Sequence, residues 1–302
     1  MLAIVIPYYK LTFFEETLDS LANQKDKRFK VYIGDDASPE NPTGLIKKYE
    51  SEINFIYKKF QNNIGRISLV KQWERCIGMI GDEEWIMILG DDDVLQNTVV
   101  ESWYKNYNLF HKKTEVIRFA SKIIIKNTPT VSNIYTHPIW ESAISSFLRK
   151  FYHTTRSSLS EYIFSKASYK KFGFYEYPLA WMSDDRAWLD FSNNKPIFTI
   201  NESIVFIRIS DLSISGNVDN NSLKKIAVTE FYKFIILKKL KQVNKLQRFE
   251  ILRKYENEIN IRRGLTYYEW NFLLFYYIKY FEFYNVKKFI KRFLKTIILK
   301  NV

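Results

Sequence analysis

A short apolar run that ends in three adjacent aspartates constrains the fold of this chain more than any other stretch. Residues 85–89 read WIMIL, and after Gly90 come three acidic residues, Asp91, Asp92 and Asp93. An unbroken apolar run of this length is typical of a strand buried on both faces of a sheet. Neighbouring carboxylates repel one another unless a cation lies among them, and their oxygens suit Mg²⁺ or Mn²⁺. The stretch predicts a buried strand that leads to a metal site, with a solvated acidic turn as the alternative.

Extended and helical patterns alternate along the first hundred residues. We expect strands over 3–6, 29–33, 53–57 and 85–89, and helices over 12–24, 44–51 and 68–80. Thr12 and Glu15 predict a capping box at the start of the first helix. This alternation predicts an α/β fold with an open, mostly parallel sheet, flanking helices and ligands at the carboxyl ends of the strands. Because Asp35 and Asp36 follow the second strand, we expect them to share an edge of the sheet with Asp91–Asp93.

The positive charge of the chain is confined to its last quarter. The net charge is +13, and residues 222–302 carry 14 Lys and 5 Arg against 6 Glu, which is the whole excess. Residues 1–221 have 27 basic and 27 acidic residues and are neutral. This asymmetry predicts a neutral domain over 1–221 and a basic region over 222–302 with a different partner.

Cysteine content and hydropathy restrict the compartment. The single cysteine, Cys76, excludes a disulfide scaffold and a multi-cysteine metal site, and fits a reducing environment. We interpret the first ten residues, MLAIVIPYYK, as a strand rather than a signal peptide. No apolar stretch reaches the length of a membrane span, so we expect a cytoplasmic location, with peripheral association at the inner face of the cytoplasmic membrane left open.

Four motifs together resemble a known family. They are IVIPYYK (4–10), VYIGDDASPE (31–40), NNIG (62–65) and WIMILGDDDVL (85–95). Their order and spacing resemble the nucleotide-binding half of family 2 glycosyltransferases, which have the GT-A fold; the likeness is strong over residues 1–100 and continues more loosely to about residue 215. The resemblance implies a nucleotide-binding half over about 1–100 and an acceptor half over about 101–221. Two positions depart from the family pattern, because Lys10 stands where Asn is frequent and Gly90 stands where the first Asp of L-D-x-D-D is usual.

The resemblance also implies roles for individual residues. Asp92, and next to it Asp93, would hold Mn²⁺ or Mg²⁺. The nucleotide would be bound by residues that follow the four expected strands, which are Pro7, Tyr9, Asp36, Asn63, Arg66 and Asp91. Asn63 has an alternative interpretation as a turn former.

A second acidic pair precedes a helix in the acceptor half. By resemblance, Asp184 and Asp185 match the pair that supplies the general base of an inverting transferase, which takes the proton from the attacking hydroxyl. The spacing to Trp188 favours Asp184, with Asp185 the close second. The alternative is that Asp184 only caps the helix.

The basic region is rich in aromatic residues as well as lysine. Residues 267–299 predict amphipathic helices, with an apolar face that includes Trp270, Leu273 and Tyr277. Basic aromatic helices suit an anionic membrane surface, and the alternative is a helical subdomain with solvated lysines. No nucleic-acid recognition motif is present.

Together these patterns predict a metal-dependent, inverting glycosyltransferase. Its donor would be a nucleotide-sugar, with a UDP-sugar as the favoured choice. Its acceptor would be the hydroxyl of a glycan or lipid-linked glycan in surface polysaccharide synthesis. Two other classes remain: a nucleotidyltransferase acting on a sugar phosphate, and a non-catalytic, membrane-associated nucleotide-binding protein. The first would need a glycine-rich phosphate loop after the first strand, and the sequence there, PYYKLTFF, has no glycine.

Overall fold

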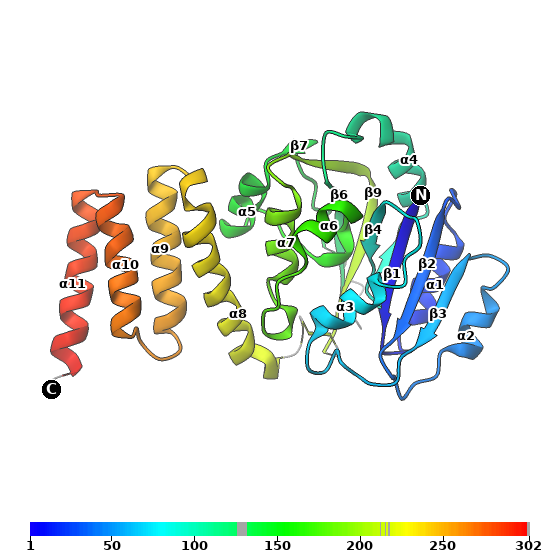
Figure 1. Cartoon of the computed structure of the whole chain (residues 1–302), viewed down its shortest axis with the longest axis horizontal. Coiled ribbons are helices and arrows are strands. Elements are labelled where there is room, and N and C mark those ends of the chain that lie inside the picture. The colour runs from blue at the N-terminus through cyan, green and yellow to red at the C-terminus, as the bar shows by residue number, and fades with distance from the viewer. Residues whose placement is uncertain (126–131, 212, 215, 217, 301–302) are drawn as a thin grey trace. The chain divides into compact units, whose positions relative to one another are not determined.

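The computed structural model describes residues 1–125, 132–211, 213–214, 216 and 218–300. The chain divides into two compact units, Met1–Asn221 and Ser222–Val302 (Figure 1).

The first unit is built on one sheet, which has nine strands within the described residues. Their order is β3-β2-β1-β4-β8-β6-β9-β5, with β7 paired to β9. β1 to β4 run parallel, whereas β8 is antiparallel to both β4 and β6. The prediction of a mostly parallel open α/β sheet is therefore confirmed. The strands are β1 (Leu2–Tyr8), β2 (Phe29–Asp35), β3 (Phe55–Lys59), β4 (Trp85–Ile88), β5 (Val94–Leu95), β6 (Val116–Ile125), β7 (Trp140–Glu141), β8 (Tyr162–Ser165) and β9 (Ile197–Ile209).

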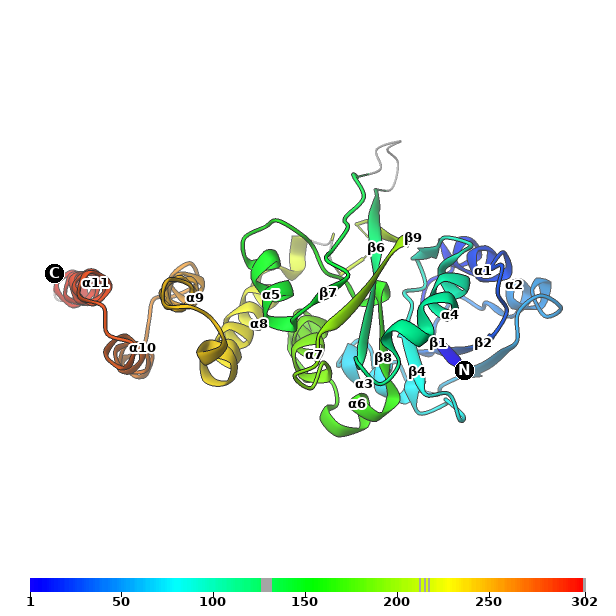
Figure 2. The same cartoon turned by 90° about the horizontal axis from the view of Figure 1, so that it is seen from above.

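Helices cover both faces of this sheet (Figure 2). Alternate residues of β1 enter two different cores: Ile4 belongs to the core that also contains residues of α1, α2 and α4, and Val5 belongs to the core that contains residues of α3, α6 and α7. Burial on both faces explains why the strands read as continuous apolar runs. The helices of this unit are α1 (Phe14–Ala22), α2 (Thr43–Lys48), α3 (Leu69–Ile77), α4 (Val99–Phe110), α5 (Ala143–Phe151), α6 (Lys166–Phe172) and α7 (Ser183–Phe191).

One local prediction is wrong. The capping box of Thr12 and Glu15 does not form, because α1 begins one residue later than such a box requires: its N-cap is Phe13, which makes no side-chain capping bond.

The second unit is helical. It contains most of α8 (Asn221–Phe234), a π-helical turn over Ile235–Lys239, α9 (Lys245–Asn260), α10 (Tyr267–Lys279) and α11 (Phe283–Lys300). Capping boxes start α9 at Asn244 and α10 at Thr266. The rings of Tyr277 and Phe289 stack with their centroids 4.5 Å apart, which joins α10 to α11. Within the described ranges, no helix has the length and apolar character needed to span a membrane.

Candidate active site

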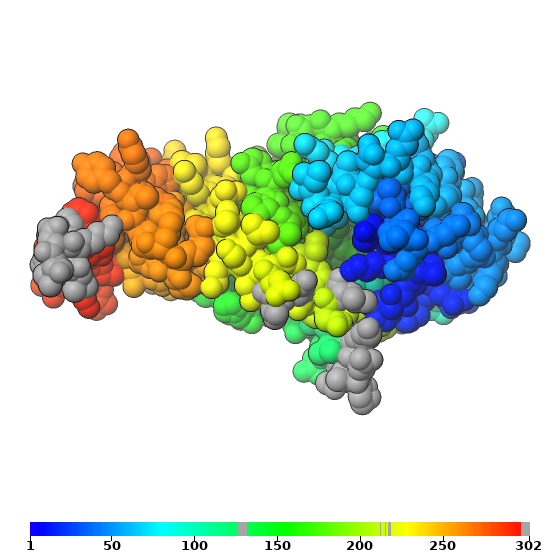
Figure 3. Space-filling model, turned by 90° about the horizontal axis from the view of Figure 1, so that it is seen from below, coloured from blue at the N-terminus to red at the C-terminus, as the bar shows by residue number. Residues whose placement is uncertain are grey.

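The carboxyl ends of β1 and β4 are joined by Asp91. Its Oδ2 accepts hydrogen bonds from the backbone amides of Tyr9 (2.7 Å) and Lys10 (2.9 Å), which directly follow β1. Pro7 is half-buried in β1 and lies beside Gly34 of β2, and the Tyr9 side chain is exposed. Both strands end toward the lower side of Figure 1, and Figure 3 looks onto that side, where residues from the start of the chain (dark blue) reach the surface.

Asp92 and Asp93 have different surroundings. Asp93 is buried, and its two oxygens accept hydrogen bonds from the Arg208 backbone amide (2.8 Å) and the Ser160 hydroxyl (2.5 Å). The Asp92 carboxylate is half-buried, and no side chain in the described part of the protein donates a hydrogen bond to it. Arg208 lies beside it, since its Nε donates to the Asp92 carbonyl at 2.9 Å. Of these two carboxylates, Asp92 is the one with oxygens left for a ligand.

Burial makes full ionisation of this cluster costly. Burial, with Asp93 and Asp91 nearby, raises the pKa of Asp92 to about 8. Burial also raises the pKa of Asp93 to about 6, although hydrogen bonds from Ser160 and Arg208 oppose the rise. A bound cation would remove this cost, since it favours the charged carboxylates.

The donor set fits a metal that is held by few protein ligands. Across the residues that the structure describes, no group of three or more His, Cys, Asp or Glu side chains is arranged to hold an ion. Mg²⁺ and its relatives are commonly bound through one or two carboxylates, with phosphate and water oxygens as the other ligands. Asp92 meets that requirement, and Asp93 less well because both of its oxygens are engaged.

Gly90 leaves the room that these carboxylates occupy. A Cβ atom at this position would lie 3.0 Å from both Asp92 Oδ1 and Asp93 Oδ2. The Gly90 amide donates to Ser160 Oγ at 3.0 Å. A side chain at position 90 would therefore require these two carboxylate oxygens to shift by a few tenths of an ångström.

Asp36 holds the loop that contains Asn63 and Gly65. Its two oxygens accept hydrogen bonds from the Ile64 and Gly65 amides, each at 2.8 Å, and the Arg75 guanidinium also bonds to it. A Cβ atom at position 65 would lie 2.4 Å from Asp36 Oδ2, so the close approach depends on glycine. The loop thus lies against the end of β2.

Within that loop, Asn63 and Arg66 are adjacent to one another. Asn63 Oδ1 accepts from the Arg66 amide at 2.9 Å, and the Arg66 side chain is exposed. This contact fits Asn63 as a turn former.

In the second acidic pair, Asp184 and Asp185, a lysine bonds to only one of the two carboxylates. Lys150 Nζ, on α5, lies 2.7 and 2.5 Å from the two oxygens of Asp185. Asp184 is the second residue of α7 and not its N-cap, which is Met182, and no described side chain donates to its carboxylate. Burial and the neighbouring Asp185 raise the pKa of Asp184 to about 7, with Lys150 acting in the opposite direction. Asp184 is therefore the member of the pair that is suited to exchange a proton.

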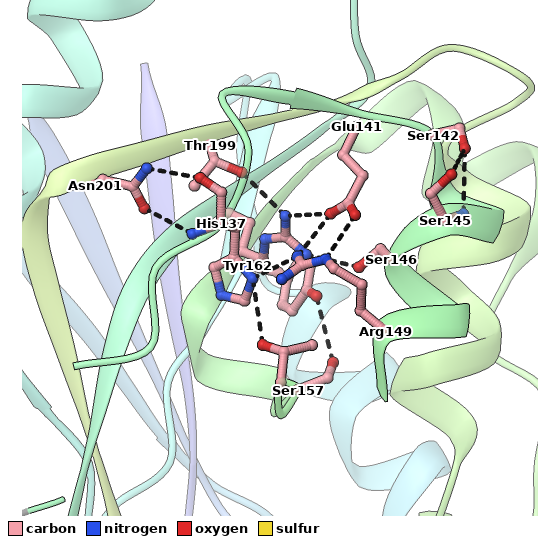
Figure 4. Close-up of polar contacts among 12 residues, drawn as sticks. His137, Glu141, Ser142, Ser145, Ser146, Arg149, Ser157, Tyr162, Thr199 and Asn201 are labelled. Atoms are coloured by element: carbon pink, nitrogen blue, oxygen red, sulfur yellow. Dashed lines mark hydrogen bonds and ion pairs between the residues drawn. The ribbon is translucent and has the colours of Figure 1, made fainter. Parts of the chain in front are cut away.

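A buried polar network fixes the end of α5 that carries Lys150 (Figure 4). Arg149 bonds to both oxygens of Glu141 at 2.7 Å, and fully buried Arg118 donates to Glu141 at 2.9 Å. Burial alone would raise the pKa of Glu141, but hydrogen bonds from Arg149 and Arg118 outweigh it and lower that pKa. His137 accepts from Arg149 through Nδ1 at 2.8 Å, and burial beside these cations lowers its pKa to about 2. His137 is thus a neutral part of the scaffold.

β8 and the residues just before it contact both the Asp91–Asp93 cluster and the helix that carries Asp184 and Asp185. Ser160, just before β8, bonds to Asp93, and the Tyr162 ring in β8 stacks on Trp188 of α7 with centroids 4.1 Å apart. α7 begins on the side of the unit where β1 and β4 end (Figure 1). No hydrogen bond between described residues joins Asp184 directly to the Asp91–Asp93 cluster.

Sequence reasoning missed three residues of this site. They are Arg75, Lys150 and Ser160, which bond to Asp36, Asp185 and Asp93. None of them belongs to a recognisable motif, and only the tertiary structure brings each to its aspartate.

Comparison with known proteins identifies relatives in sequence and in structure. A glycosyltransferase of Mycoplasma genitalium, MG060, whose function is uncharacterised, is 28% identical over 112 residues, which are 34% of this chain and 36% of that protein. The crystal structure of S. aureus TarS 1–349 superposes with a TM-score of 0.60 at 15% identity, covering 92% of this chain and 80% of that chain. The same TarS fragment in complex with UDP-GlcNAc gives a TM-score of 0.63 with the same identity and coverage. At this identity the TarS structures establish the likeness of the fold, which is that of GT-A glycosyltransferases.

The family follows from the sequence match. The model of glycosyl transferase family 2 matches residues 3–160, which are just over half of the chain and include both strand-end acidic clusters. The chain therefore belongs to glycosyl transferase family 2.

Proposed function

We propose that this protein transfers a sugar from a nucleotide-sugar to an acceptor hydroxyl with inversion at the anomeric carbon. The favoured donor is a UDP-sugar. The observation that carries the proposal is the pair of open carboxylates in a family 2 fold: Asp92 after β4 and Asp184 at the start of α7. The TarS neighbour was crystallised with UDP-GlcNAc, which supports the donor class.

The donor nucleotide is proposed to lie across the carboxyl ends of β1, β2 and β4. Asp91 ties β1 to β4 and Asp36 ties the loop of Asn63 to β2, so both aspartates build the walls of this site. Pro7, Tyr9 and Arg66 complete the proposed nucleotide-binding set.

Mn²⁺ or Mg²⁺, held by Asp92 with Asp93 next to it, would supply Lewis-acid stabilisation of the leaving diphosphate. Asp184 accepts the proton of the acceptor hydroxyl as the new glycosidic bond forms. Its pKa of about 7 suits this task, since a general base works best when its pKa is near the operating pH. Asp185 cannot take this role as readily, because Lys150 occupies both of its oxygens.

The acceptor is proposed to be a glycan or a lipid-linked glycan of surface polysaccharide synthesis, reached at the inner face of the cytoplasmic membrane. The basic second unit supports this choice, because anionic lipid surfaces attract clustered lysines.

Calorimetric titration of UDP and of GDP, with and without Mn²⁺, tests the donor site. We expect UDP to bind in a Mn²⁺-dependent way, and Asp92→Asn to weaken that binding at least about tenfold. Asp82→Asn is the matched control, because Asp82 is an exposed loop residue before β4. Wild-type affinity in Asp92→Asn would overturn the metal assignment, and absence of nucleotide binding with any metal would overturn the function.

A further inference from the structure

The turn between α10 and α11 exposes apolar side chains that a soluble helical hairpin would normally bury. Four large apolar residues within seven positions are between 58% and 69% exposed, and three exposed lysines accompany them. We call this set the tip patch; it consists of Ile278, Lys279, Phe281, Phe283, Tyr284, Lys287 and Lys288.

No ion pair joins a lysine of the tip patch to an acidic side chain in the described part of the chain, whereas two arginines of the same unit are paired. Arg292 bonds to Glu256, and Arg263 bonds to Glu269. Lys288 Nζ instead lies 3.9 Å from the centre of the Tyr284 ring, a cation–π contact on the surface. Glu282, the acidic residue of this turn, accepts hydrogen bonds from the Tyr284 and Asn285 backbone amides. The tip patch therefore presents three lysines against one carboxylate, beside apolar rings.

We propose that the tip patch docks on an anionic lipid bilayer. Aromatic and aliphatic side chains enter the boundary between headgroups and acyl chains, while lysines beside them meet lipid phosphates. Charge complementarity selects this occupant over a second copy of the chain, because two copies joined through the patch would bring six lysines together. The inference extends the proposed function from a membrane location to a defined set of residues, and docking does not require catalysis.

Co-sedimentation of the 302-residue chain with vesicles tests the proposal. We expect binding to vesicles of phosphatidylcholine mixed with phosphatidylglycerol, and little binding to phosphatidylcholine alone. Each lysine near an anionic surface contributes roughly a factor of five, so Lys279→Gln/Lys287→Gln/Lys288→Gln should weaken binding about a hundredfold. Ile278→Ser/Phe281→Ser/Phe283→Ser should weaken it at least tenfold.

A matched triple variant separates the tip patch from net charge. Lys225→Gln/Lys233→Gln/Lys238→Gln removes the same charge from exposed lysines of the same unit and should change binding only a few-fold. Equal losses in both lysine variants, or no binding of the wild type to the anionic vesicles, would overturn the proposal. So would a dimer in sedimentation equilibrium that the serine variant converts to monomers. A failure of the vesicle tests would not change the expected binding of UDP or its loss in Asp92→Asn. The docking proposal and the proposed function can therefore fail separately.

Discussion

Asp184 and Asp185 are neighbours in sequence but have different surroundings, because Lys150 contacts only the carboxylate of Asp185. Lys150 binds both oxygens of Asp185, and Asp184 keeps a carboxylate whose pKa is about 7. Groups of the same type are commonly assigned different roles by their environments in this way. Lys150 is thus a positioning residue for the proposed base, and it acts through electrostatics and through Asp185.

Replacing Lys150 should move the pH dependence of turnover. Lys150 lowers the pKa of Asp184, so Lys150→Met should raise that pKa and shift the acid limb of kcat/KM from near pH 7 upward by about one unit or more. The base acts when deprotonated, so activity is lost as pH falls through its pKa, and the variant loses activity at higher pH than the wild type. The measurement is UDP release across pH 5.5 to 9.5.

Two further variants control this experiment. Lys150→Arg keeps the charge and should restore most of the wild-type profile. Lys170→Met removes an exposed lysine of α6 and should leave the profile unchanged. If Lys150→Met folds normally and its acid limb stays at the wild-type pH, Lys150 does not tune the base.

At the scale of elements, the first four strands and both strand-end acidic clusters were predictable, because apolar runs and turn residues are local signals. β2 was expected over 29–33 and spans Phe29–Asp35, and β4 was expected over 85–89 and spans Trp85–Ile88. In the acceptor half, Trp140 and Glu141 pair with β9 as a strand, and α5 begins after them at Ala143. Ser160 and Lys150 could not be found, since their partners are 67 and 35 residues away in sequence.

The contact between β2 and α3 gives a prediction about packing. A Cβ atom at position 34 would lie 2.2 Å from Cys76 Sγ of α3, so Gly34→Ala should lower the free energy of unfolding by up to about 3 kcal/mol. Removing the sulfur relieves the clash, so Gly34→Ala should cost at least about 1 kcal/mol less in a Cys76→Ala background. Urea denaturation of the four proteins measures this coupling.

A second glycine serves as the control for that cycle. A Cβ atom at Gly44 in α2 would meet nothing within 4 Å, so Gly44→Ala should stabilise the protein by up to about 1 kcal/mol. If the changes in the free energy of unfolding caused by Gly34→Ala and Cys76→Ala are additive, the prediction is wrong, and α3 can move away from β2 at little cost.

At the scale of the whole molecule, chemistry and charge are distributed unequally between the two units. Every residue proposed to bind the donor or to act as the base lies in Met1–Asn221, which has no net charge. The tip patch lies in Ser222–Val302, which has a net charge of +13. This division implies that nucleotide binding and lipid docking depend on separate sets of residues.

Two variants, each measured in both assays, test that separation. Asp184→Asn leaves the tip patch intact and should bind phosphatidylglycerol vesicles as the wild type does, while its turnover falls roughly a hundredfold or more, the range for loss of a general base. Ile278→Ser/Phe281→Ser/Phe283→Ser alters only exposed side chains, so its affinity for UDP with Mn²⁺ should stay within about twofold of the wild type. A loss of UDP affinity in the serine variant, with its melting temperature unchanged, would mean that the second unit contributes to the donor site, and the division of labour between the units would then be wrong.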